Sequence, residues 1–449
     1  MTRVLLTTVY RPFCGNDPFD SPKNLVQHGV CHRHFTREQG AFSIHQQCSH
    51  LALHLIAANI EAETDILEYP SLDEFQDALG QAVREDRPYD YVGVTCVSSY
   101  VRKARHLCEL AKQHSPGSAT IVGGGGVLAI GELVEPFSDH TCRGDGVRFF
   151  RELLGQDPEA SIDHPTVPSV HFPNQIMAWR GNPVSYSLAV SLGCERRCDF
   201  CATSAHFAGR RVPILSSATQ IFLAMRRVET DLKAAGETVP TIQFAVFDEN
   251  FLTNEKVCRE FQQINREQLK RGTQYLLFLF ADAASLSRFT AVDLLEMGVD
   301  SVWVGMESGD DRRFSKNRGV DFRRLVSELQ DNGIKVFISF IAGLEDQTAA
   351  DMDRDAEYAL SFGAAGFQYG IACPLPGTAY YDRLKREGRL SAERPEQLNM
   401  SHYYIRHPEV TDEQVREKTV RFLRRDYERH GPLALRYMQL RLQGYLRHR

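Results

Sequence analysis

The sequence contains no long hydrophobic run, no strong excess of charge of one sign and no repeated or low-complexity segment. Its apolar stretches fall well short of the ~20 residues that span a bilayer, which argues against a transmembrane protein. A net charge of −6 argues against a protein that binds nucleic acid with its whole surface. No small-residue cleavage site follows the start MTRVLLTTVYRPF, so we expect a first β-strand there and not a signal peptide.

Cysteine pairing of the kind seen in exported proteins is also not indicated. Eleven cysteines is an odd number in a chain without an export signal, and it fits a reducing compartment where cysteines are buried thiols or metal ligands. We therefore expect a cytoplasmic protein. Eight of the cysteines are scattered, whereas three lie within eight residues.

The length of 449 residues predicts two or three domains. The first part alternates short β-branched runs with amphipathic stretches, which is typical of an α/β fold with a doubly wound parallel sheet. The strands expected here are 3–10, 65–69, 91–97, 119–122 and 141–142, and the helices are 45–61, 71–83 and 101–114.

A second α/β series follows a polar, proline-containing stretch. Its expected strands are 185–192, 241–247, 275–280, 301–306, 335–340 and 366–371, with amphipathic helices between them. Six βα units favour a partial (β/α)6 barrel over a full eight-stranded one. We expect a first domain at 1–155, a linker at 156–183, the barrel at 184–390 and a helical C-terminal region at 391–449.

The three clustered cysteines lie in SLGCERRCDFCATSAHF, directly after an expected strand. Cys194, Cys198 and Cys201 on one tight loop can each bind a different iron of a [4Fe–4S] cluster, and the lack of a fourth cysteine leaves one iron open. Zinc is an alternative with His206 as a fourth ligand, but structural zinc sites usually have two paired knuckles and no second knuckle occurs nearby. Three buried thiols are a further alternative, disfavoured by the charged residues around them.

The cysteine spacing, with Phe200 before the last cysteine, resembles the signature of the radical S-adenosylmethionine superfamily. The resemblance extends over residues 185–390. It implies that the open iron binds the amino and carboxylate groups of S-adenosylmethionine. One-electron reduction by an external donor of the flavodoxin or ferredoxin type would then yield methionine and a 5′-deoxyadenosyl radical that abstracts hydrogen.

This resemblance further implies contacts with S-adenosylmethionine at the carboxyl ends of the barrel strands. FAVFDENFLTN resembles the segment that binds the methionine amino group, although the usual Gly-Gly-Glu is not present. GMESG resembles the segment that binds the ribose or the methionine carboxylate, and SFIAGLED resembles the one that supports adenine. The residues implied are Asp248, Glu249, Asn250, Asp282, Glu307, Ser308, Ile341 and Gly343.

Structural alternatives exist for several of these residues. Asn250 or Thr253 could cap a helix, and Asp282 could be a helix N-cap. Gly343 could be a turn glycine. Cys373, after the sixth strand, is better interpreted as a buried thiol than as a cavity residue.

The domain ahead of the barrel resembles the cobalamin-binding domain of the class B radical S-adenosylmethionine enzymes. The resembling residues are Thr95, Val97, Ser98, Ser99, Tyr100, Gly123, Gly124, Gly125, Gly126 and the segment CRGDG at 142–146. The resemblance implies a cleft behind two neighbouring strands, where glycines let the backbone approach a nucleotide-like tail.

One departure concerns the lower face of the cobalt. The common Asp-x-His-x-x-Gly signature is absent from VYRPFCGNDPF. A Cys/His group in QHGVCHRH could bind zinc or approach cobalt, or form a hydrogen-bonded loop; its members are His28, Cys31, His32 and His34. We interpret His45, Cys48, His50 and His54 as packing residues of a helix.

The C-terminal segment 416–449 carries ten Lys or Arg residues against three acidic ones, with large apolar residues between them. It could contact an anionic or lipid substrate at a membrane surface. We favour a helix that packs its apolar face on the barrel and leaves its arginines in solvent.

The resemblances favour a cobalamin-dependent radical methyltransferase that acts on an unactivated carbon of a small or lipidic metabolite. Methylcobalamin on the first domain would face the cluster and S-adenosylmethionine, with substrate between them. An alternative enzyme would form rings, rearrange or couple carbons without methyl transfer. A third hypothesis, from another class, is a non-catalytic cobalamin or iron–sulfur module for sensing or electron transfer.

Overall fold

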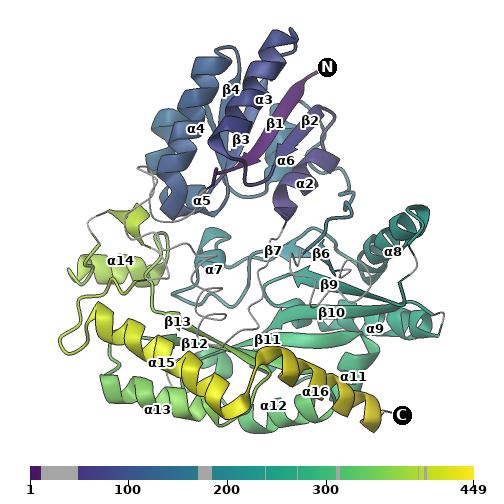
Figure 1. Cartoon of the computed structure of the whole chain (residues 1–449), viewed down its shortest axis with the longest axis vertical. Helices are drawn as coiled ribbons and strands as arrows, with labels where there is room; N and C mark the ends of the chain where they lie inside the picture. Colours follow the sequence, from purple (N-terminus) through teal and green to yellow (C-terminus); the bar gives the residue numbers. More distant parts are fainter. Residues whose placement is uncertain are drawn as a thin grey trace.

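The computed structural model of the chain contains two parallel sheets, one above the other (Figure 1). It describes residues 1–11, 49–169, 185–237, 239–270, 272–309, 314–392, 394–398 and 402–448.

The N-terminal sheet has five parallel strands in the order β2-β1-β3-β4-β5. Its strands are β1 (Arg3–Thr8), β2 (Glu63–Leu67), β3 (Tyr91–Thr95), β4 (Ala119–Gly123) and β5 (His140–Thr141). Its helices are α2 (Leu51–Ala58), α3 (Leu72–Arg84), α4 (Val101–His114), α5 (Gly125–Val134) and α6 (Gly146–Leu153). One buried apolar cluster joins the sheet to α3, α4 and α5, and another joins it to α2 and α6. Helices on both faces confirm the doubly wound fold.

The direction of winding reverses between β1 and β3, and ligands of such sheets bind beyond the carboxyl ends of the strands at this switch point. The helix expected at 45–61 is shorter in the structure, where α2 covers Leu51–Ala58. Residues 45–48 lie outside the described part of the chain, as do His28, Cys31, His32 and His34.

The second sheet has six parallel strands in the order β13-β12-β11-β10-β9-β6. Its strands are β6 (Ser185–Ala189), β9 (Thr241–Phe247), β10 (Gln274–Ala281), β11 (Val299–Glu307), β12 (Lys335–Ala342) and β13 (Gly366–Ile371). Its helices are α8 (Ala218–Ala234), α9 (Glu255–Leu269), α10 (Ala283–Leu286), α11 (Ala291–Glu296), α12 (Phe322–Asp331), α13 (Ala349–Leu360) and α14 (Ala379–Arg386). The strands β6 and β13 form the two edges, which confirms the expected partial barrel.

Alternation along the barrel strands separates two faces. In β10, Tyr275, Leu277 and Leu279 are fully buried in the core beneath the helices, whereas Phe278 and Phe280 between them are only partly buried. The even-numbered positions of β10 therefore face the inside of the barrel.

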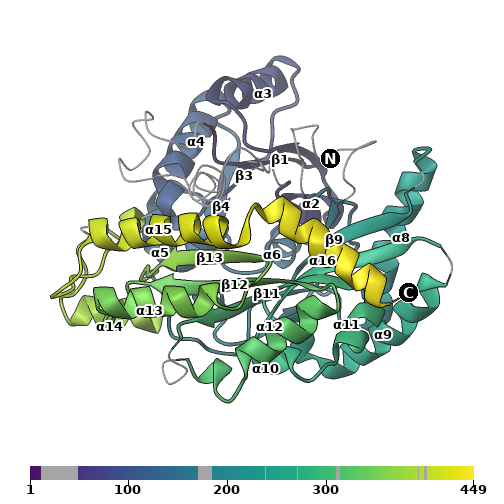
Figure 2. The same ribbon diagram turned by 60° about the horizontal axis from the view of Figure 1, so that its bottom comes forward.

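Two C-terminal helices lie against the barrel, one after the other (Figures 1 and 2). Helix α15 (Asp412–His430) packs on β13 and α13, and α16 (Leu433–Arg447) packs on α12 and β12. The described residues contain no helix both long and apolar enough to cross a membrane.

Candidate functional site

The carboxyl ends of both sheets meet at a cavity of about 500 Å³. The first domain contributes Gly124, Gly125 and Leu128 after β4, Gly144 to Val147 after β5, and part of α2. The barrel contributes residues of the cysteine loop, the ends of β9 and β10, and Thr203, His206 and Phe207. A site between two units of the chain is a common place for cofactors.

The three cysteines lie on a loop between the two-residue strands β7 (Ser191–Leu192) and β8 (Val212–Pro213). Gly193 begins the loop with φ of 76°, and a Cβ there would lie 2.2 Å from the Arg210 carbonyl oxygen. Cys201 is the N-cap of the short helix α7 (Ala202–His206). The loop is therefore fixed by its backbone at both ends.

All three thiols are half-buried and free of disulfides. Burial raises the pKa of each, that of Cys198 to about 11, so a bound metal would have to displace the protons. Within the described residues no three His, Cys, Asp or Glu side chains converge on one metal ion. A cubane cluster needs no such convergence because each cysteine binds its own iron; the donor set fits it.

His206, the alternative fourth zinc ligand, lies in the wall of the cavity between the sheets. Its Nε2 atom is 3.5 Å from the position that a Cβ on Gly377 would take. Burial lowers the pKa of His206, and the ring bonds to the backbone of Pro376. The structure thus gives this histidine a partner outside the cysteine loop.

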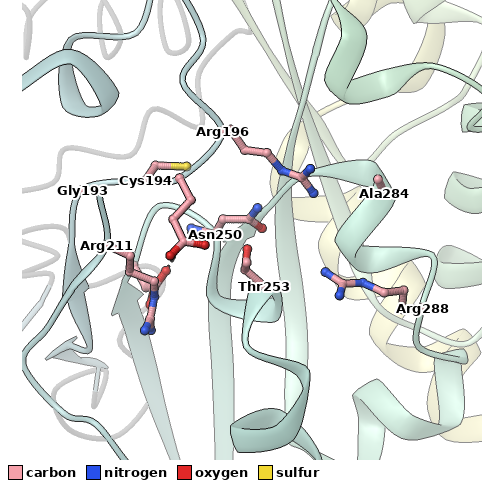
Figure 3. A pocket seen from close by; sticks show the side chains of 10 residues that line it. Gly193, Cys194, Arg196, Arg211, Asn250, Thr253, Ala284 and Arg288 are labelled. Atoms are coloured by element: carbon pink, nitrogen blue, oxygen red, sulfur yellow. Dashed lines mark hydrogen bonds and ion pairs between the residues drawn. The ribbon is translucent and has the colours of Figure 1, made fainter. Parts of the chain in front are cut away.

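A second cavity of about 540 Å³ adjoins the cysteine loop and shares Gly193 and Asp248 with the first (Figure 3). Figure 3 shows Cys194 and Arg196 above this cavity, with Asn250 and Thr253 below them and Arg288 at the far side. Three arginines line it, namely Arg196, Arg211 and Arg288. This wall can accommodate an anionic group.

Arg196 ties the cysteine loop to the barrel. Its Nε and Nη2 donate to the two carboxylate oxygens of Asp282 at 2.7 and 2.9 Å. Asn250 bonds to the same carboxylate through its side-chain amide and accepts a hydrogen bond from the Asp282 backbone N–H at 3.1 Å. Asp282 also caps α10 by accepting from the N–H of Ser285. The N-cap alternative for Asp282 is therefore correct, and its carboxylate positions the loop as well.

Asp248 is buried, and both of its carboxylate oxygens have hydrogen-bond or ion-pair partners. It accepts hydrogen bonds from Ser191 Oγ at 2.7 Å and from the backbone N–H of Asn250 at 2.9 Å, and it pairs with Arg211. These bonds hold the β7–β8 ribbon on the end of β9. Asn250 occupies the N-cap position of a short 3₁₀ helix (Phe251–Thr253) without a side-chain cap bond, and Asn254, not Thr253, provides the side-chain cap of α9.

Glu249 differs from its neighbours because its side chain is exposed to the cavity between the sheets. Burial by the surrounding protein raises its pKa above the usual range, and a hydrogen bond from Thr203 offsets this in part. Among the described residues no cation pairs with Glu249. Of the two carboxylates that line this cavity from this segment, that of Glu249 is exposed, whereas that of Asp248 is buried and paired.

At the end of β11, Glu307 has φ of 67° beside a bulge in the β11–β12 pairing. Its buried carboxylate pairs with Lys316. Burial disfavours the charge on Lys316, but the Glu307 carboxylate raises the pKa of this lysine overall. The positive charge of Lys316 in turn offsets part of the rise that burial causes in the pKa of Cys198. Ser308 instead donates to Asp355 at 2.8 Å and links the strand end to α13.

Ile341 is partly buried against the barrel core. Gly343 has φ of 78°, and a Cβ there would lie 2.8 Å from the ring of Tyr403. The glycine therefore permits close approach of the C-terminal region, and a role near adenine stays a prediction for both residues. Cys373 packs in a small cluster with Tyr381 and Tyr404, as expected of a structural thiol.

The glycine run after β4 has two roles. A Cβ on Gly124 (φ 92°) would lie 2.6 Å from Thr95 Oγ1, and one on Gly126 would lie 2.8 Å from the Val97 carbonyl carbon. A Cβ on Gly125 would meet nothing within 4 Å, and Gly125 lines the cavity. This arrangement leaves a cradle that a side chain would fill, which suits a bulky nucleotide-like cofactor.

The residues after β3 support this turn from behind. Ser98 and Tyr100 are buried, and with Ser99 they form a short 3₁₀ helix (Ser98–Tyr100) packed against α5. A Cβ on Gly123 would lie 3.3 Å from the Cβ of Cys142.

The histidines at the start of α2 make local contacts. His54 pairs with Glu68, and the His50 backbone N–H bonds to the same carboxylate, so both histidines pack locally.

Sequence reasoning missed an aromatic lining on the inside of the barrel. We call it the inner aromatic face; its members are Phe247, Phe278, Phe280, Trp303 and Phe337. Trp303 stacks on Phe337 at 5.7 Å between ring centroids and lies 5.8 Å from Phe280. Phe247 and Phe280 line the cavity between the sheets. Alternation within β10 could have indicated this face.

Sequence reasoning also missed Lys316 and the two arginines that bind Asp248 and Asp282. Arg196 lies within the cysteine motif, so its position near the cysteines could have been predicted. Lys316 follows its strand at a distance that no motif fixes, and only the fold brings it to Cys198.

No protein-family profile matches the chain. An uncharacterized methyltransferase from Pyrococcus horikoshii is 22% identical over 369 residues, 74% of this chain and 77% of that protein. Hopanoid C-2 methylase from Rhodopseudomonas palustris is 25% identical over 232 residues, 50% of this chain and 42% of that protein.

Among solved structures, the radical S-adenosylmethionine methyltransferase TsrM from Kitasatospora setae, with cobalamin and a [4Fe–4S] cluster bound, superposes with a TM-score of 0.61 at 16% identity. The match covers 88% of this chain and 80% of TsrM. The cobalamin-dependent S-adenosylmethionine radical enzyme OxsB gives 0.57 at 13% identity, covering 91% of this chain and 64% of OxsB. The chain therefore has the fold of these cobalamin-dependent radical S-adenosylmethionine enzymes, which confirms the expected fold class.

Proposed function

We propose that this protein is a cobalamin-dependent radical S-adenosylmethionine enzyme that methylates an unactivated carbon of an apolar metabolite. One observation carries the proposal: Gly193 and Thr203, on either side of the three cysteines, line one cavity together with Gly124 and Gly125 of the doubly wound domain, and Cys194 lines the adjoining cavity. Methyltransferases among the sequence relatives, and TsrM among the structures, support it.

In this proposal Cys194, Cys198 and Cys201 hold a [4Fe–4S] cluster. Such a cluster supplies the electron that cleaves S-adenosylmethionine. Glu249 would bind the methionine ammonium, since it is the cavity-facing carboxylate near the cysteine loop. Lys316, held by Glu307, would place a positive charge beside Cys198. Arg196 and Asp282 keep the loop in position.

Cobalamin would lie against Gly124, Gly125, Gly144 and Gly146, which line the cavity from the first domain. Gly125 leaves open space in front of the backbone, and Thr95 and Ser98 stabilise the turn that presents it. Cobalamin in this place would carry the methyl group. The residues around it would orient it and exclude water.

The substrate proposal rests on the inner aromatic face. Phe247 is 44% exposed and Phe280 lines the cavity, so the barrel presents aromatic rings, and few charges, to a molecule at its mouth. Aromatic faces bind apolar and ring-bearing molecules well. We therefore propose a lipidic substrate whose apolar body lies on this face.

We also propose the partners and boundaries that follow. An external flavodoxin or ferredoxin in the cytoplasm would supply electrons.

The proposed domain boundaries follow the ends of the two sheets. The cobalamin domain would be residues 1–155 and the barrel 184–390, joined by 156–183, with 391–449 as the helical C-terminal region. Helix α6 ends at Leu153 and β6 begins at Ser185, which fits these bounds. Residues 1–155 expressed alone should then bind hydroxocobalamin.

The deciding experiment is an anaerobic assay of the reconstituted chain with reductant, S-adenosylmethionine and lipid extract. Formation of 5′-deoxyadenosine and S-adenosylhomocysteine together, with a substrate heavier by one methylene, supports methyl transfer. Formation of 5′-deoxyadenosine without S-adenosylhomocysteine would favour ring formation, rearrangement or coupling instead. No cleavage of S-adenosylmethionine by cluster-loaded protein would favour a non-catalytic module.

A further inference from the structure

The C-terminal helix α16 exposes a stripe of large apolar side chains. They are between 52% and 65% exposed, and they are Leu435, Met438, Leu442, Tyr445 and Leu446. Their spacing of i, i+3, i+7, i+10 and i+11 places them on one face of the helix. We call this set the α16 stripe. The expectation that the tail would bury its apolar face and expose its arginines is met only in part: α15 buries Val415, Phe422 and Leu423, whereas α16 exposes this stripe and buries Arg436.

The exposure of the α16 stripe follows from how α16 is attached. Arg436 is buried and pairs with Asp426 of α15, and it donates to the Ala364 carbonyl at 3.1 Å. Gly444 packs so closely on Gly333 that a Cβ on it would lie 2.7 Å from the Gly333 Cα. Arg436 and Gly444 thus attach α16 to the barrel together with Tyr437, whose ring centroid lies 5.7 Å from that of Phe337, and the α16 stripe is left exposed.

This face is anomalous for a surface helix. Scattered single apolar residues are normal on protein surfaces, whereas a contiguous set marks an interaction site. Five of the exposed large apolar side chains in the described residues belong to this one helix.

We propose that the α16 stripe docks on the surface of an anionic membrane. The helix contains no acidic residue, and its basic residues are Arg436, Arg441 and Arg447. Arg441 flanks the stripe, is exposed and forms no ion pair with any described residue. Arg436 is buried and Arg447 bonds to the Asp331 carbonyl, so Arg441 is the basic residue beside the stripe. An apolar stripe beside a basic residue, on a helix without acidic residues, fits a helix that lies in the interface of an anionic bilayer.

Charge also distinguishes a membrane from a second copy of the chain. Two α16 helices packed face to face would bring their Arg441 side chains near each other, with no acidic residue in either helix to compensate. An anionic bilayer supplies the opposite charge. This inference does not depend on methyl transfer, because it concerns a surface remote from the cysteine loop.

The test is vesicle sedimentation of the full reconstituted chain. Vesicles of phosphatidylcholine with 30% phosphatidylglycerol are compared with vesicles of phosphatidylcholine alone. The chain should bind the anionic vesicles, and Leu442→Glu should weaken binding about tenfold or more, because it removes apolar contact and adds a negative charge. Arg441→Gln should weaken binding to anionic vesicles and leave the weak binding to neutral ones unchanged.

Leu223→Glu is the matched control, because Leu223 is 59% exposed on α8, away from the stripe. It should bind vesicles like the wild type, and circular dichroism should show all variants folded. Equal binding of Leu442→Glu and wild type would overturn the proposal. A wild-type dimer in light scattering that Leu442→Glu converts to monomer would also overturn it, since the stripe would then join two copies.

Discussion

At the scale of single residues, neighbouring glycines of the run 123–126 have different roles: Gly126 allows close backbone packing, and Gly125 leaves space open towards the cavity. Gly126→Ala should destabilise the protein by about 1–3 kcal/mol, since the new methyl group meets backbone atoms of Val97 and Ser98. Urea unfolding of the full chain measures this. Gly117→Ala is the control, because a Cβ there meets nothing within 4 Å. Equal unfolding midpoints for the two variants would contradict the close packing.

Gly125→Leu tests the other task of the run. The position is open towards the cavity, so the leucine should leave stability nearly unchanged and weaken binding of hydroxocobalamin by about tenfold or more. Titration by visible absorbance on the full chain gives the affinity. Wild-type affinity in Gly125→Leu would remove the glycine cradle from the cofactor site.

Cys198→Ala should abolish formation of 5′-deoxyadenosine and reduce iron well below about four per chain, because the cluster loses one of three ligands. Iron analysis and chromatography of the products measure both effects. Cys373→Ala is the control, since that thiol packs in a small cluster of its own and its pKa is raised by burial to about 12. Near-normal turnover of Cys198→Ala would refute the cluster assignment.

Candidate residues that lie close together in the sequence could be identified from the sequence alone. The cysteine loop stands out because its three cysteines lie within eight residues, and their role as cluster ligands stays a prediction. Asp248 and Asp282 were recognised as strand-end carboxylates, but only the structure shows that they form ion pairs with Arg211 and Arg196. Lys316 was not recognisable, because its place beside Cys198 depends on how β11 and the following loop fold back.

At the scale of elements, the Arg196–Asp282 pair joins the cysteine loop to the start of α10. Asp282→Asn keeps a good N-cap but loses the charge that binds Arg196, so we expect a loss of stability of about 1–3 kcal/mol and lower cluster occupancy. Asp321→Asn is the control, an exposed N-cap of α12. Urea unfolding of the apoprotein and iron analysis measure the two effects.

The effect of Asp282→Asn should depend on pH. Burial alone would raise the pKa of Asp282, but the bonds from Arg196 and Ser285 lower it overall. A carboxylate with a lowered folded pKa stabilises above its unfolded pKa and loses this contribution as the pH falls. The difference between wild type and Asp282→Asn should therefore be largest near neutral pH and narrow below about pH 4. A pH-independent difference would contradict the ion pair.

Elements with long periodic patterns were predicted well, and of the two-residue strands β5 was expected within one residue of its place. The six barrel strands appear within a few residues of their expected bounds, because a buried parallel strand is a continuous apolar run. The two-residue strands β7 and β8 carry no pattern that could have revealed them. The exposed stripe of α16 was not predicted, because contacts of Arg436, Tyr437 and Gly444 with distant segments determine which face of the helix is buried.

At the scale of the whole molecule, the site arises because two sheets present their carboxyl ends to the same cavity. The doubly wound fold and the partial barrel were each predictable from the order of their strands. Their apposition was not, because it depends on tertiary contacts such as those of α5 with α7, far apart in sequence. The cavity consequently combines a polar, charged rim near the cysteines with the inner aromatic face.

The aromatic surface makes the substrate class testable without turnover. Trp179→Phe leaves Trp303 as the sole tryptophan, and its emission should shift when an apolar ligand covers the inner aromatic face. A cyclic triterpene should bind, and a polar amino acid should not. Phe280→Ala should weaken binding by about tenfold, because one ring of the surface is removed. Phe222→Ala, on α8 outside the barrel, should leave binding unchanged. Equal responses to polar and apolar ligands would rule out a lipidic substrate while leaving the radical chemistry untouched.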